Sequence, residues 1–116
     1  MPRKFIKSFK YAHAGATHAV RTQRNLWIHF AAGVLVLCMA LYLKISRTEL
    51  SILILAVFGV IVTEMVNTAL EALVDVLSPE FRAEAALAKN VAAAAVLLAA
   101  LGALIIGGLI FIPRLI

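Results

Sequence analysis

Five polar residues near the end of a long apolar stretch have the types and spacing of residues that bind ligands or take part in catalysis. They stand at offsets of 0, 3, 4, 7 and 11 along one segment: Glu64, Asn67, Thr68, Glu71 and Asp75. On a helix that turns about 100° per residue, these positions fall within an arc of roughly 100°. A rise of about 1.5 Å per residue places Glu71 about 10 Å beyond Glu64. One helix face therefore carries three carboxylates and two neutral polar groups.

Acidic groups on a membrane helix are costly, which indicates that they have a use. Each costs about 3 kcal/mol at the bilayer centre on insertion scales, and less near the interface. We expect Lys89, at the start of the next apolar stretch, to approach the same face. Carboxylates, an amide and an ammonium together suit a hydrated divalent cation that carries a polyphosphate. The alternative is structural, with these groups only joining helices or pairing with Arg82 and Lys89.

The motifs of soluble nucleotide and zinc enzymes are absent from the sequence. It contains no GxxxxGK[ST] loop, no protein-kinase catalytic loop and no HExxH. Phosphate chemistry in this chain would therefore need another scaffold.

The elements that must position these residues are predicted from composition. Hydrophobic residues make up 64% of the 116 positions, which is more than a soluble domain of this size can bury. Three stretches reach the roughly 20 apolar residues that a spanning helix needs. We predict an all-α membrane protein with transmembrane helices over 26–45, 50–77 and 88–112, in one domain of residues 1–116. His29, about one turn into the first span, is interpreted as an interfacial hydrogen-bonding residue rather than a metal ligand.

Residues 1–24 mix apolar side chains with Lys, His and Thr, a pattern that predicts an amphipathic helix lying on the membrane surface. Six of the eleven basic residues precede Leu26, so the positive-inside rule puts the N-terminus in the cytoplasm. Three spans then put the C-terminus outside. These charges suit anionic headgroups, and we expect no nucleic-acid partner. Without a cleavable signal pattern, the chain is expected to be a multi-pass protein of the inner (plasma) membrane.

The polar face and the start of the next helix resemble the signature of a known family. Glu64-x-x-Asn67-Thr68-Ala69-x-Glu71-x-x-x-Asp75, with Ala88-Lys89 opening an alanine-rich helix, is similar to the prokaryotic diacylglycerol kinases, which are small integral membrane lipid kinases. Further segments resemble the undecaprenol kinase branch: Ser8-Phe9-Lys10-Tyr11-Ala12 with Gly15, Arg24-Asn25, His29 and Ile110-Phe111-Ile112-Pro113.

The resemblance implies a homotrimer whose subunits each have three spans and a surface helix. It implies an enzyme that uses ATP and Mg²⁺ to phosphorylate a membrane lipid alcohol, with undecaprenol favoured and diacylglycerol as the alternative. Glu64 would then be the general base, with Glu71 and Gln23 as metal ligands. Nucleotide and phosphate contacts would come from six residues: Lys4, Lys7, Asn67, Asp75, Lys89 and Asn90.

Two positions depart from the family pattern. The family usually has Glu before the Arg24-Asn25 pair, where this chain has Gln23, and Asp after Lys89, where it has Asn90. Both changes remove a negative charge, and an uncharged Gln holds Mg²⁺ less tightly than Glu. A catalytically impaired homologue is therefore one alternative to an active kinase, and a non-enzymatic membrane scaffold is another.

Overall fold

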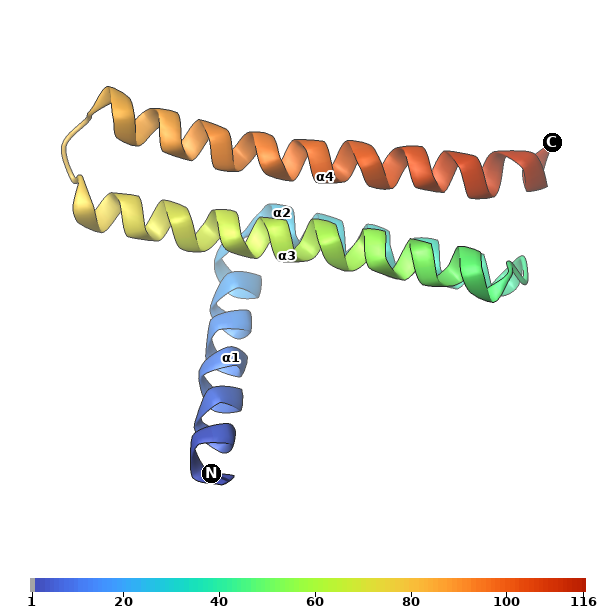
Figure 1. Ribbon diagram of the computed structural model, residues 1–116, viewed down its shortest axis with the longest axis horizontal. Coiled ribbons are helices and arrows are strands. Elements are labelled where there is room, and N and C mark those ends of the chain that lie inside the picture. Colours follow the sequence, from blue (N-terminus) through green and yellow to red (C-terminus); the bar gives the residue numbers. More distant parts are fainter. Residues whose placement is uncertain (1) are drawn as a thin grey trace.

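A computed structural model describes residues 2–116 as four helices joined by short connections. They are α1 (Pro2–Thr22), α2 (Arg24–Tyr42), α3 (Arg47–Leu77) and α4 (Ala83–Leu115). The described part of the chain is all-α, and α2, α3 and α4 are each long and apolar enough to cross a membrane. Figure 1 shows these three running alongside one another, with α1 leaving them crosswise. This is the direction expected of a helix along the surface of a membrane that the others cross.

The bundle is held together through α3, which packs against both α2 and α4. We call the part around the α2–α3 connection, residues 43–46, the Ser46 end, and the part around the α3–α4 connection, residues 78–82, the Ser78 end. At the Ser46 end, a buried cluster joins all three spans through Ala40, Leu53, Ile110 and Phe111. These side chains interdigitate where α2 turns back into α3 and where α4 ends.

Polar contacts reinforce the Ser46 end. Ser46 caps α3, because its Oγ accepts a hydrogen bond from the Glu49 amide at 3.1 Å while the Glu49 carboxylate accepts one from the Ser46 amide. The same carboxylate accepts two hydrogen bonds from the Arg114 guanidinium, one of them at 2.9 Å. A fork-to-fork contact of this kind fixes geometry as well as adding attraction. It ties the start of α3 to the end of α4.

The helix limits differ from the predicted spans by a few residues. α3 begins at Arg47 rather than at residue 50, because the Ser46 cap draws three polar residues into its first turn. α4 begins at Ala83 rather than at residue 88, with Glu84 in a first turn where the helix dipole favours an acid. Small residues recur about every four positions along α4, and most of them are half-buried within the single chain while Ala95 is exposed: Ala88, Ala92, Ala95, Ala99, Ala103 and Gly107.

Candidate active site

Glu64 is the one charged residue that is buried among residues 2–116, with 3% of its surface exposed. It lies on α3, facing α2, where His29 Nε2 stands 3.8 Å from Glu64 Oε2. No side-chain hydrogen bond within the described chain reaches the Glu64 carboxylate. Its oxygens therefore have no partner in this chain that would compete with a ligand hydroxyl.

The position of Glu64 along the spans can be judged from its distance to α1, the predicted surface helix. The last turns of α1 and the start of α2 surround an apolar pocket together with Ile61 and Met65, the residue after Glu64. Glu64 thus lies at the level where α1 meets the spans. With a rise of about 1.5 Å per residue, Glu71 lies about 10 Å and Asp75 about 16 Å further along α3. The polar face therefore runs outward from the level of α1 toward the Ser78 end.

The middle of the polar face carries an unpaired oxygen. Asn67 Oδ1 is buried and has no hydrogen-bond partner in the described chain. A buried polar atom without a partner costs roughly 1–3 kcal/mol, so a ligand or a neighbouring chain is expected to supply one. Thr68 instead uses its hydroxyl within α3, donating to the Glu64 carbonyl at 2.9 Å. Glu71, one turn beyond Asn67, is half-buried.

Lys89 reaches the outer part of this face, as its position in the sequence predicts. Its ammonium donates to Asp75 Oδ1 and so joins the end of α3 to the start of α4. The side chains are 38% and 66% exposed respectively, so this pair is open to water. Asn90 is exposed and takes part in no side-chain hydrogen bond within residues 2–116.

The remaining predicted site residues lie on or beside α1. Gln23 separates α1 from α2, and its side chain makes no capping hydrogen bond, so the amide is free to bind a ligand. Lys4 and Lys7 are exposed on the N-terminal half of α1, which points away from the spans in Figure 1. No hydrogen bond or ion pair in the described chain connects either lysine to the polar face.

The donor set fits Mg²⁺ only if the ion arrives with a phosphate ligand. Within residues 2–116, no three His, Cys, Asp or Glu side chains come together as a metal site would require. Mg²⁺, however, is commonly bound by one or two carboxylates together with substrate phosphates and water. The half-buried Glu71 and the unpaired Asn67 oxygen one turn away supply hard oxygen ligands of that kind.

The contact between His29 and Glu64 was not predicted from the sequence. His29 was interpreted as an interfacial group, without a partner on another helix. A signal was nevertheless present, because α2 and α3 form an antiparallel hairpin about residues 43–46. Residues equally far from the centre of this turn lie opposite each other on the two helices. Residue 29 therefore lies opposite residue 60, which is one helical turn from Glu64.

Comparison with known proteins identifies the family. The family model described as prokaryotic diacylglycerol kinase matches residues 10–111, and the chain belongs to this family. It is 42% identical over 111 residues to a Synechocystis protein named diacylglycerol kinase, covering 95% of this chain and 63% of the relative. It is 38% identical over 112 residues to a Bacillus subtilis protein named undecaprenol kinase, covering 97% and 91%. The chain thus spans less than two thirds of the Synechocystis protein, and the resemblance deduced from the polar face is confirmed.

Proposed function

We propose that this chain transfers the γ-phosphate of ATP to the hydroxyl of a membrane lipid at the polar face of α3. The observation that carries the proposal is the buried Glu64 carboxylate, which lies at the level of the surface helix without a hydrogen-bond donor of its own. A lipid hydroxyl also lies at that level. Family membership supports the reaction class.

In the proposed mechanism, Glu64 removes the proton from the lipid hydroxyl as a general base. The lipid oxygen forms a bond to the γ-phosphorus, while the bond from that phosphorus to its bridging oxygen breaks and ADP leaves. Glu71 and Gln23 hold Mg²⁺, which, when bound, neutralises charge on the phosphates. Asn67, further out along α3, holds the nucleotide.

The outermost residues of the polar face would bind phosphate. Lys89 would exchange its partner Asp75 for a phosphate oxygen, and Asn90 would contribute an amide. Lys4 and Lys7 would join them only if α1 bends toward the face or belongs to a neighbouring subunit. The six residues predicted to contact the nucleotide or its phosphates therefore fall into two groups. One lies along α3 and α4 near Glu71, and the other lies on α1 and needs another arrangement to reach the site.

For the acceptor we propose undecaprenol, with diacylglycerol as the alternative. The relative named undecaprenol kinase matches this chain over 91% of its own length, while the one named diacylglycerol kinase extends well beyond the match. A domain of about this length thus makes up most of the relative named undecaprenol kinase. We also propose that the N-terminus lies in the cytoplasm, since ATP is found there and most basic residues precede Leu26.

A purely structural role for the polar face competes with the kinase proposal. The Lys89–Asp75 pair favours it, because that contact joins two helices without any ligand. Purified protein in micelles, given ATP, Mg²⁺ and either lipid, distinguishes the possibilities. Phosphorylated lipid is expected, and undecaprenol is expected to be the better acceptor. Nucleotide binding without product would indicate an impaired homologue with Gln23 and Asn90 as causes, whereas absence of both would favour a scaffold.

We further propose a homotrimer, with the number taken from the family resemblance. Asn67 Oδ1 lacks a hydrogen-bond partner in the described chain, and Glu71 and Asp75 remain partly exposed, so this face has polar groups that a neighbouring subunit would cover. A neighbouring subunit that laid its α1 over this face would cover the acids and also bring Lys4 and Lys7 to the phosphates.

Subunit mixing tests this assembly. A Glu64→Gln chain and a Lys4→Gln/Lys7→Gln chain, each inactive alone, should regain activity when mixed, because one mixed site then has both functional parts. Cross-linking in mild detergent should give trimers. Monomers that retain full activity would contradict the trimer.

A further inference from the structure

His29 faces the Glu64 carboxylate across the α2–α3 contact. The two side chains are 27% and 4% exposed, and Nε2 lies 3.8 Å from Oε2. It is the one basic group among residues 2–116 within ion-pairing distance of Glu64. At 3.8 Å the contact is longer than a hydrogen bond of 2.7–3.2 Å, so a small movement of either side chain would complete one.

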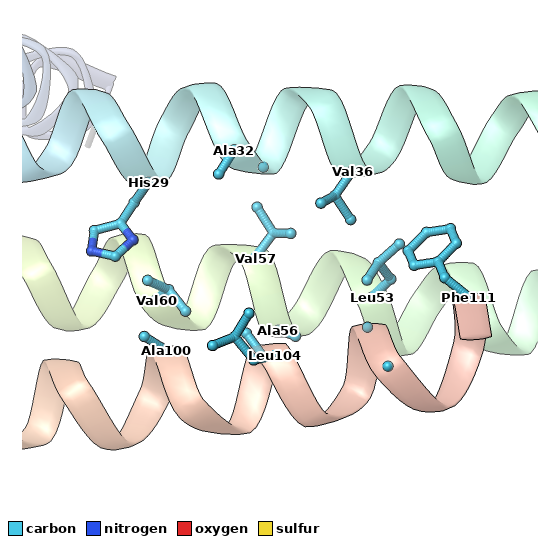
Figure 2. A pocket seen from close by; sticks show the side chains of 14 residues that line it. His29, Ala32, Val36, Leu53, Ala56, Val57, Val60, Ala100, Leu104 and Phe111 are labelled. Atoms are coloured by element: carbon cyan, nitrogen blue, oxygen red, sulfur yellow. The ribbon is translucent and has the colours of Figure 1, made fainter. Parts of the chain in front are cut away.

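The surroundings of His29 leave its ring no other polar partner. It stands at one edge of a cavity of about 370 Å³ between α2, α3 and α4, and every other residue that lines the cavity is apolar. Figure 2 shows the ring reaching from α2 toward α3 beside Val60, one turn before Glu64. No hydrogen bond within the described chain involves the ring nitrogens. The imidazole is therefore oriented by packing alone and is free to interact with the carboxylate.

We propose that His29 is a positioning residue for Glu64. An N–H of its ring holds the carboxylate in the orientation that meets the lipid hydroxyl, and the burial of Glu64 limits the access of water to that place. Because no side-chain hydrogen bond within the described chain fixes the Glu64 carboxylate, its terminal torsion, which has a broad preference, is otherwise set by packing alone. This inference rests on the proposed function, since it assigns His29 a part in proton removal by Glu64.

Two variants of His29 separate positioning from packing. His29→Leu keeps an apolar side chain of similar reach but has no N–H, while His29→Gln keeps an N–H donor. We expect kcat of His29→Leu to fall roughly 10²-fold, as misplacement of a reacting group by about 1 Å does, with KM for ATP unchanged. His29→Gln should recover most of kcat. His18→Leu, on the exposed side of α1, is the matched control and should behave as the wild type.

Unfolding equilibria of the single and double variants test the contact without any assay of transfer. The changes caused by His29→Leu and Glu64→Gln should be non-additive, because the two groups interact. Wild-type kinetics in His29→Leu, or equal losses of kcat in His29→Leu and His29→Gln, would overturn the proposal. Additive unfolding changes would overturn it as well. A wild-type protein that phosphorylates no lipid would instead reject the proposed function, and the positioning role with it, whatever the unfolding cycle shows.

Discussion

At the Ser46 end, apolar side chains from three helices bury one another, whereas from Asn67 toward the Ser78 end the polar side chains of α3 are unpaired or increasingly exposed. Ala40 and Leu53 are almost fully enclosed, and the Glu49–Arg114 contact closes the helix ends above them. The other end has the open Asp75–Lys89 pair and the unpaired Asn67 oxygen. One end is held by contacts within the chain, while the other leaves polar groups without partners in the described chain.

Together with the proposed function, this difference implies that stability and chemistry are separated along the spans. In lipid, apolar burial does not drive helices together, and close packing and polar contacts must hold them. The Ser46 end supplies both. This allows polar groups nearer the Ser78 end to stay unpaired without loss of the fold, as the proposed active site requires.

Replacing one acid in each region, Glu64 on the polar face and Glu49 at the Ser46 end, tests this separation and should give the largest effect. Glu64→Gln should lower kcat by about 10²–10⁴-fold, because an amide cannot take the proton from the lipid hydroxyl. Nucleotide affinity should stay nearly unchanged, and the unfolding midpoint should not fall. Glu49→Gln is the matched control, and should lower the unfolding midpoint by weakening the contact with Arg114 while leaving turnover intact. Assays of transfer and of unfolding in SDS check both, and a reversed pattern would refute the separation.

Widening the α2–α3 contact should have the next largest effect. A Cβ added at Gly33 would lie 2.6 Å from Cγ1 of Val57, whose χ1 angle is restricted in a helix. Gly33→Ala should therefore cost about 1–3 kcal/mol of stability and lower kcat, since it moves His29 away from Glu64. Gly59→Ala is the control, because its added methyl group meets nothing within 4 Å. Equal unfolding midpoints for the two variants would show that α2 and α3 are less closely packed than described.

Restoring a charge at the metal site should have a smaller effect. Gln23→Glu adds one negative charge near the proposed Mg²⁺, and a unit charge pair 4 Å apart in water is worth about 1 kcal/mol. The Mg²⁺ concentration for half-maximal rate should therefore fall about fivefold. Thr22→Glu places the same charge one residue earlier, on the exposed side of α1. An equal shift in both variants would mean that the charge acts at a distance and that Gln23 is not a ligand.

Much of the fold was predictable because helical periodicity and span length are local properties. The polar face of α3 follows from offsets within 12 residues, and the three spans follow from runs of apolar residues. The helix itself begins three residues before the predicted span, and the sequence carries the signal for this start, because Ser46 with Glu49 three residues later is a capping pattern.

Contacts between helices were less predictable, because they depend on rotation and register. Glu49 and Arg114 are 65 residues apart and meet only because α3 and α4 run antiparallel over nearly their whole lengths. His29 and Glu64 depend similarly on the α2–α3 hairpin. The approach of Lys89 to the polar face was predictable, since a short loop necessarily returns α4 to the end of α3.

The ion pair at the Ser78 end should have the smallest effect on stability. Asp75 and Lys89 are 66% and 38% exposed, and such surface pairs contribute about 0–1 kcal/mol. A double-mutant cycle with Asp75→Asn and Lys89→Gln should therefore give a coupling below about 1 kcal/mol in unfolding. Lys89→Gln should nevertheless raise KM for ATP, because the ammonium is proposed to bind phosphate.

A second double-mutant cycle, with Glu49→Gln and Arg114→Gln at the Ser46 end, provides the coupling energy with which that of Asp75 and Lys89 is compared. Its coupling should be the larger of the two, since two hydrogen bonds join that pair and both side chains are about one-third exposed. KM for ATP should not change there, because this pair lies at the far end of the spans from the proposed nucleotide site. A larger coupling for Asp75 and Lys89, with KM unaffected, would make that pair a structural link. It would also remove Lys89 from the phosphate site and strengthen the scaffold alternative.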